Sequence, residues 1–118
     1  MSKAFKSFKA DEMQWKEILN EKVGRSLFKN ELIKDDDTGI EIYFTKYPAG
    51  FINPKHNHPH AHGIYVVKGI FHTSKGDFNP GSFVWFPEGE VMWHGATEDT
   101  DVELLFITNK PFVINYLE

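Results

Sequence analysis

Residues 50–69 read GFINPKHNHPHAHGIYVVKG, a run of alternating histidines that leads into a short apolar stretch. Side chains of a strand alternate between its two faces, so His56 and His58 are expected on one face with Asn57 opposite. Proline lacks a backbone N–H and disturbs a regular ladder, so Pro59 is expected to interrupt the strand. The stretch therefore predicts two imidazoles side by side on one face of a β-strand.

His60 and His62 share the parity of the first pair, but the break at the intervening proline means that alternation alone does not decide which points inward. Residues 63–69 are rich in β-branched and aromatic side chains, which is typical of a strand. His62 stands at the entrance of that strand and can join its inward row with Ile64 and Val66. We therefore expect His62 to face the same space as the first pair.

Imidazole is a good ligand for Zn, Cu, Fe and Ni, so this pattern predicts a metal site. Two ligands from one strand, one from its neighbour and one from farther along the chain can surround an ion inside a barrel, and His94 is the candidate for the distant ligand. The alternative is a histidine-rich loop that is merely solvated. His60 and His72 fit a supporting or surface role better than coordination.

Short β-branched or aromatic runs alternate with turn signals along most of the chain, which is typical of an all-β sandwich or barrel. The turn signals are rich in Gly, Pro, Asp and Asn and lie at 35–39, 48–50, 75–77, 79–81, 87–89 and 109–111. Strands are expected over 27–28, 40–47, 64–71, 82–86, 102–108 and 112–117.

The N-terminal part of the sequence has a different pattern. Residues 1–10 are basic and aromatic, which suits either a mobile arm or an edge strand. Residues 11–21 predict a short helix, because Asp11 can act as its N-cap and Gln14 stands three positions later, as in a capping box. A loop is the alternative. The apolar side chains of this helix that would face the body are Met13, Ile18 and Leu19.

Length and composition predict one domain over 1–118, with an arm and short helix over 1–24 and a barrel over 25–118. The net charge is 13 − 17 = −4, and no strongly basic face or run is evident, so nucleic acid is not an expected partner. Cysteine is absent, which excludes disulfides and thiolate ligands. Neither a signal peptide nor a membrane-spanning run is recognisable, so a cytoplasmic protein without membrane contact is expected.

The stretch also resembles the first motif of the cupin superfamily. That motif is a Gly, five residues, His-x-His, three or four residues, a Glu, six residues and a Gly. Here Gly50, His56, His58, His62 and Gly69 have the same spacing. His62 replaces the Glu of the family, as in certain small one-domain cupins with four histidine ligands.

The second cupin motif has a Gly, five residues, Pro-x-Gly and a His. Gly81, the run 87–89 and His94 resemble it, so the likeness covers roughly residues 50–98. Four residues separate Gly89 from His94 where the family usually has two, and the extra pair can form a bulge that still aims His94 inward. The family's Asn four positions later is Glu98 here. A narrower likeness links 36–39 and 48–50 to acetylacetone-cleaving dioxygenases and zinc-binding cupin domains of anti-sigma factors.

The resemblance implies a cupin jelly-roll β-barrel with one divalent transition metal per chain, held by His56, His58, His62 and His94. The sequence does not choose among Fe, Zn, Ni, Mn and Cu. A shell of four neutral ligands leaves the ion its full charge, so the ion polarises a bound oxygen strongly. Two open positions on a six-coordinate ion can hold a bidentate diketone or enolate, or a substrate together with dioxygen.

Alternation places a mainly apolar set of side chains in the barrel, without a convincing inward Lys or Arg, and predicts a pocket for a small apolar or aromatic ligand. Any of these residues can instead be simply core. Three functions are compatible with the site: a metal-dependent oxygenase, a metal- or ligand-sensing module without turnover, and a metal-dependent isomerase or lyase. Analogy with the family suggests a homodimer. The pocket candidates are Phe44, Ile64, Val66, Phe83, Trp85, Met92, Leu104 and Phe106.

Overall fold

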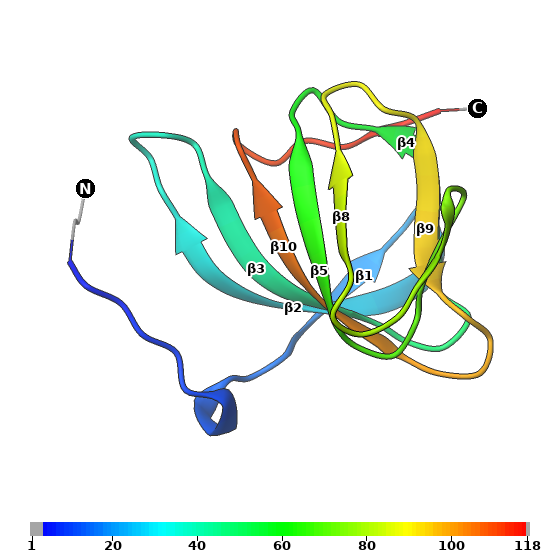
Figure 1. The fold of residues 1–118 in the computed structure, drawn as a ribbon, viewed down its shortest axis with the longest axis horizontal. Coiled ribbons are helices and arrows are strands. Elements are labelled where there is room, and N and C mark those ends of the chain that lie inside the picture. The colour runs from blue at the N-terminus through cyan, green and yellow to red at the C-terminus, as the bar shows by residue number, and fades with distance from the viewer. Residues whose placement is uncertain (1–3, 118) are drawn as a thin grey trace.

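The computed structural model describes residues 4–117, so residues 1–3 of the predicted arm and residue 118 lie outside the described part. Two antiparallel sheets curve around a common interior and form a barrel (Figure 1). The all-β prediction is confirmed. No helix among the described residues is long and apolar enough to cross a membrane.

The larger sheet has six strands. In spatial order they are β1 (Lys16–Asn20), β2 (Arg25–Lys34), β3 (Glu41–Tyr47), β10 (Val102–Thr108), β5 (His62–Lys68) and β8 (Phe83–Phe86). The smaller sheet has five strands. In spatial order they are β11 (Asn115–Tyr116), β4 (Ile52–Asn57), β9 (Met92–Ala96), β6 (Phe71–Thr73) and β7 (Gly76–Phe78).

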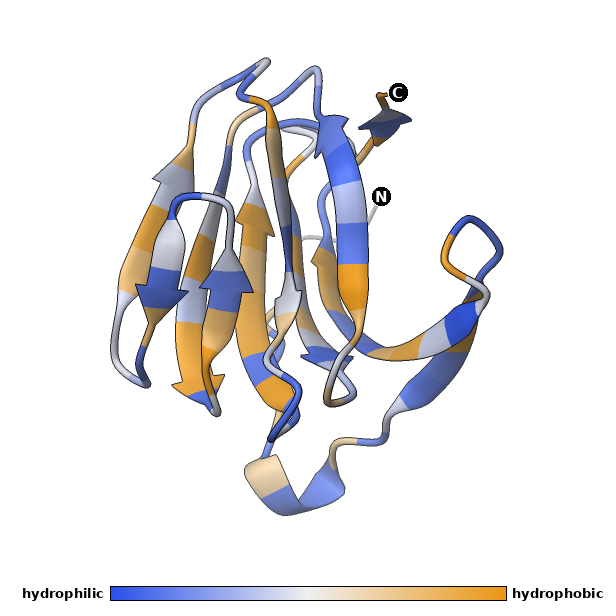
Figure 2. Cartoon of the chain, turned by 90° about the vertical axis from the view of Figure 1, so that its right-hand side faces the viewer, coloured by the Kyte–Doolittle hydropathy of each residue, from blue (hydrophilic) through white to orange (hydrophobic). Residues whose placement is uncertain are grey.

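The barrel interior is built from alternate residues of the strands, as Figure 2 shows in the banding of apolar and polar residues. Strand β10 is the clearest case, because every second residue from Val102 to Thr108 is buried while the residues between are only half-buried. This period of two is the side-chain repeat of a strand. The buried core includes Phe51, Ile64, Val66, Phe71, Val102, Leu104 and Phe106.

The predicted helix over 11–21 is wrong. Over residues 10–21 the structure has only a single 3-10 turn, at Ala10–Glu12, followed by strand β1. Strand β1 pairs with β2 in register from Lys16↔Lys29 to Asn20↔Arg25, and Gly24 closes the hairpin with a φ of 78°. The ladder satisfies the backbone of both strands and buries part of Ile18 against the core, which outweighs a weak local helix preference.

Other differences concern short strands. Strands β6, β7 and β9 were not predicted separately, and the predicted run 64–71 divides at Gly69. Gly69 has a φ of 81°, and a Cβ there would lie 2.1 Å from the carbonyl oxygen of Asp101. Only glycine fits so close to a neighbouring backbone, so the chain turns at this point from the larger sheet into the smaller one.

Candidate metal centre

The four histidines predicted as ligands lie together inside the barrel. His56 is on β4 and His94 is on β9, its neighbour in the smaller sheet. His62 is the first residue of β5 in the larger sheet, and His58 lies one residue beyond the end of β4. All four side chains are buried, with at most 2% of any residue exposed.

A bulge in β4 gives His56 and His94 the same inward orientation. Asn53 pairs with His94 and His56 pairs with Met92, so three steps on β4 match two on β9. The extra step changes the parity of β4 between Asn53 and His56, and both side chains are buried. The prediction of a bulge just before His94 is therefore wrong, because the bulge lies in β4. The chain before β9 instead forms a turn in which the Glu90 N–H donates to the Pro87 carbonyl.

The spacing of the imidazole rings is compatible with one shared ion. Ring centroids lie 4.9 Å apart for His56 and His58, and 4.8 Å apart for His56 and His94. His58 and His62 are 4.6 Å apart, and each of these pairs is close to perpendicular. A metal–nitrogen distance of about 2.0–2.1 Å places neighbouring imidazoles of one ion roughly 4.5–5 Å apart between centroids. The observed separations fall in that range.

Hydrogen bonds select the ring nitrogen available for a metal in two of these residues. His56 Nδ1 lies 2.6 Å from the carbonyl oxygen of Pro54, and His58 Nδ1 lies 2.6 Å from that of Val113. A carbonyl oxygen only accepts, so Nδ1 must carry the proton in both rings. Each Nε2 then has a free lone pair, which is the tautomer that metal-bound histidines generally adopt.

Buried nitrogens without partners mark the same four residues. The Nε2 atoms of His56 and His58 and both nitrogens of His62 and His94 have no hydrogen-bond partner among residues 4–117. A buried polar atom of this kind costs about 1–3 kcal/mol when it is left unpaired. Metal coordination would satisfy one nitrogen of each ring, so the donor set fits a metal ion.

His60 and His72 differ from these four. His60 is fully buried, but its Nδ1 lies 3.1 Å from the carbonyl oxygen of Ala61 and its Nε2 accepts the N–H of Val113 at 3.2 Å. His72 stands on the outside of β6 and pairs with Asp77. Both arrangements agree with supporting and surface roles.

Burial keeps the cluster neutral. It lowers the pKa of His58 to about 4 and that of His62 to about 2, and neighbouring histidines add to both effects. The pKa of His56 is lowered and that of His94 lies well below its usual value, again chiefly through burial. Neutral imidazole is the form that binds metal. The cluster is therefore ready to coordinate at neutral pH without first releasing protons.

The donor atoms do not yet converge fully. Within residues 4–117, no group of three or more histidine or carboxylate side chains already has the arrangement of a coordination shell. The ring separations suit a shared ion, but binding it would require the ring nitrogens to come closer together.

A cavity of about 460 Å³ leads from His58 and His94 to the surface between β1, β2 and the C-terminal segment. This volume is within the range of small-molecule sites. Apolar and aromatic side chains form most of its wall. They include Ile18, Leu27, Tyr43, Tyr47, Phe106, Phe112 and Ile114.

The predicted pocket residues are only partly placed as expected. Phe106 lines the cavity, whereas Ile64, Val66, Met92 and Leu104 are buried in the core, the alternative reading given above. The prediction that Phe83 and Trp85 line the pocket is wrong, because both lie on the outer face of β8 and are 59% and 54% exposed. Phe44 is also misplaced, since its neighbours Tyr43 and Thr45 take the inward positions of β3.

Several cavity residues were missed. Tyr43, Thr45 and Tyr47 alternate along β3, and that period of two was a usable signal in the sequence. Lys29 lines the cavity as well, although no inward cation was expected. Its strand, β2, extends well beyond the two residues predicted, so its inward side could not be assigned from the sequence.

The chain belongs to the ChrR cupin-like domain family, whose profile matches residues 4–113. Among solved structures, an RmlC-like cupin protein from Ralstonia eutropha JMP134 has a TM-score of 0.80 and 18% identity, covering 98% of this chain and 73% of that one. A putative dioxygenase from Nostoc punctiforme PCC 73102 also has a TM-score of 0.80 with 18% identity, over 94% of this chain and 41% of that one.

The anti-sigma factor ChrR, solved in complex with SigE of Rhodobacter sphaeroides, has a TM-score of 0.68 and 17% identity, over 85% of this chain and 51% of that one. No curated protein matches the sequence. Identities this low establish the shared fold alone. The solved neighbours differ widely in role, since a polyketide cyclase and a predicted oxalate decarboxylase are also among them.

Proposed function

We propose that one divalent transition metal per chain binds His56, His58, His62 and His94, and that the protein is a metal-dependent oxygenase acting on a small diketone, phenolic or similar compound. The observation that carries this proposal is the set of buried ring nitrogens without partners, confined to the side chains that the sequence selects as ligands. A resident divalent ion would supply Lewis-acid polarisation of a bound oxygen.

The surrounding residues support such a site in defined ways. The carbonyls of Pro54 and Val113 hold the protons of His56 and His58 on Nδ1, so both rings offer Nε2. Phe106 stacks on His62 at 4.8 Å with an interplanar angle of 8°, and restrains that ring. The apolar cavity excludes bulk water from the substrate while leaving one side of the cluster accessible.

The test begins with elemental analysis of protein purified without a histidine tag. We expect about one transition-metal ion per chain, strongly reduced by His62→Ala and little changed by His60→Ala. Iron-loaded protein should then consume oxygen with a 2,4-diketone or a catechol. Equal metal loss in the two variants would contradict the ligand assignment. Normal metal content without oxygen uptake on any such compound would contradict the oxygenase.

A non-catalytic sensing module is the second candidate, favoured by membership of the ChrR cupin-like domain family and by the neighbour solved with a sigma factor. In that case the resident ion would be tightly held zinc with no exchangeable position. Azide binding to cobalt-substituted protein, followed by its visible spectrum, separates the candidates. A spectral change indicates an open position and supports the oxygenase, and an unchanged spectrum supports the sensor.

A further inference from the structure

Two lysine side chains line the cavity that leads to the histidines, and of these Lys22 is exposed whereas Lys29 is half-buried. Lys29 extends inward from β2, and its Nζ lies 4.5 Å from the ring centroid of Tyr43 and 4.7 Å from that of Phe112. Both distances are within the range of cation–π contacts. Within residues 4–117, no carboxylate forms an ion pair with this ammonium group. Aromatic faces therefore hold the cation, and its N–H donors remain available.

Thr45 stands beside Lys29 and has an unused polar atom. The two residues are directly opposite each other in the β2–β3 ladder, and both line the cavity. Thr45 is 1% exposed, and its Oγ1 has no hydrogen-bond partner among the described residues. A buried hydroxyl and an ammonium group with free donors, on paired residues that line one cavity, can together bind an acceptor group.

We propose that Lys29 and Thr45 together bind the carboxylate of a small anionic ligand whose apolar or aromatic body lies against Tyr43, Phe106 and Phe112. This proposal rests on the proposed function only for the reaction at the end of the ligand that faces the histidine cluster. Binding of the carboxylate by Lys29 and Thr45 does not depend on it. His58 and His94 line the same cavity, so a ligand anchored at Lys29 extends toward the histidine cluster.

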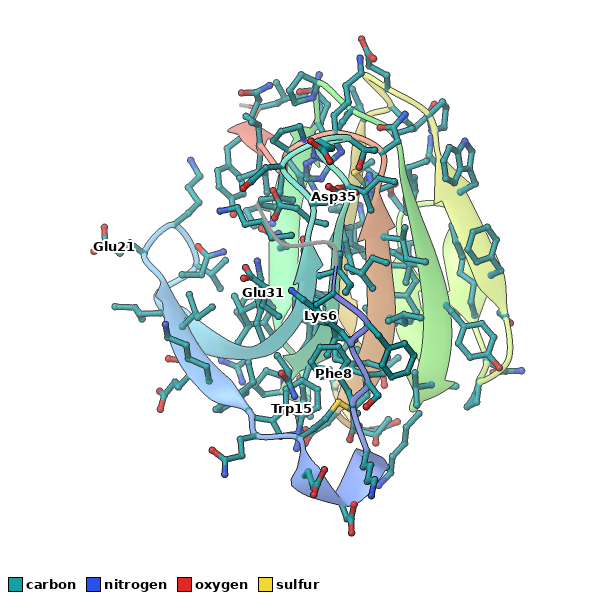
Figure 3. All side chains as sticks on the ribbon, turned by 90° about the vertical axis from the view of Figure 1, so that its left-hand side faces the viewer. Lys6, Phe8, Trp15, Glu21, Glu31 and Asp35 are labelled. Carbon is teal, nitrogen blue, oxygen red and sulfur yellow. The ribbon has the colours of Figure 1, made fainter. Side chains whose placement is uncertain are left out.

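The chemistry of the pair favours an anion over a neutral group. Carboxylates accept charge-assisted hydrogen bonds from ammonium and ordinary ones from hydroxyl groups. Burial lowers the pKa of Lys29, and the negative charges of Glu41 and Glu31 (the latter labelled in Figure 3) act in the opposite direction with smaller effect. Glu41 is already an acceptor for the Phe112 N–H at 2.9 Å. A bound carboxylate would give the ammonium a partner that these side chains do not provide.

The test compares benzoate with benzamide, its neutral isostere, by ligand-observed NMR and calorimetry on the full chain. Both are measured with protein loaded with zinc and with protein treated with chelator. We expect benzoate to bind roughly tenfold or more tightly than benzamide, as a charge-assisted hydrogen bond implies. The comparison on the unmodified protein needs no variant, so it remains decisive if a substitution prevents folding.

Variants then assign the preference to residues. Lys29→Met should remove most of the preference for benzoate, Lys29→Arg should retain it, and Thr45→Val should weaken it partially. Lys55→Met is the matched control, because Lys55 is exposed on β4. Metal content is measured in every sample, so loss of the ion is distinguished from loss of anion binding. Equal binding of benzoate and benzamide, no saturable binding, or full retention in Lys29→Met would each overturn the proposal.

Discussion

Replacing His62 by leucine should stabilise the metal-free protein. His62 is fully buried, and neither of its ring nitrogens has a partner among the described residues. Leucine is similar in size and has no polar atom to leave unsatisfied. A residue kept for a ligand, and not for packing, is expected to lower stability when that ligand is absent.

The magnitude follows from the contacts of the ring. Removing the two unsatisfied buried nitrogens gains about 2–3 kcal/mol, with each taken near the lower end of the range of about 1–3 kcal/mol. Against this, the stack on Phe106 at 4.8 Å is lost, and such stacking contributes about 0.5–1.5 kcal/mol. The net gain is about 1–2 kcal/mol, which raises Tm by roughly 3–10 °C for a chain of this size. Zinc at about a thousand times its Kd should stabilise the unsubstituted protein by about 4 kcal/mol and the variant hardly at all.

The assay is thermal unfolding followed by circular dichroism at pH 7, with chelator and then with excess zinc. His60→Leu is the matched control, because it changes the same residue type two positions away. His60 Nε2 accepts the N–H of Val113 at 3.2 Å, so its loss leaves that N–H unpaired and should destabilise the protein by about 1–3 kcal/mol. If His62→Leu is destabilised as strongly as His60→Leu in chelator, the reasoning fails.

Three further predictions concern pH, packing and assembly. Burial holds the pKa of His58 near 4 while the unfolded side chain has a value near 6.5, so the unfolded state binds more protons between these values. The free energy of unfolding should have its full value above about pH 6.5 and fall by about 3 kcal/mol toward pH 4. Metal should be released over the same range. A melting temperature independent of pH would refute this. Gly95→Ala should cost about 3 kcal/mol in urea unfolding, because its Cβ would lie 1.9 Å from the carbonyl oxygen of Phe51 and force β4 and β9 apart. The exposed aromatic side chains of β5 and β8, including Trp85, suit a homodimer, and light scattering that gives the mass of one chain would count against it.

The candidate ligands could be selected from the sequence because their signal is local. Short turns marked by Gly50, Gly69 and Gly89 fix where the strands between them begin and end. The spacing of the histidines therefore indicates which of their side chains face the same side. The all-β class could be predicted for the same reason, since period-two alternation and turn residues act within a few positions of each other.

Only the tertiary structure decided which face of each strand is inside and which polar atoms remain unpaired. Residues 16–20 became a strand because β2 was available for pairing, and Phe83 and Trp85 face outward because β8 joins β5 in that register. His60 and His62 differ in their hydrogen bonds to a segment more than fifty residues away, and Lys29 reached the cavity through the pairing of β2 with β3. Strand register and hydrogen bonding depend on partners distant in the chain, so they cannot be predicted from a local sequence pattern.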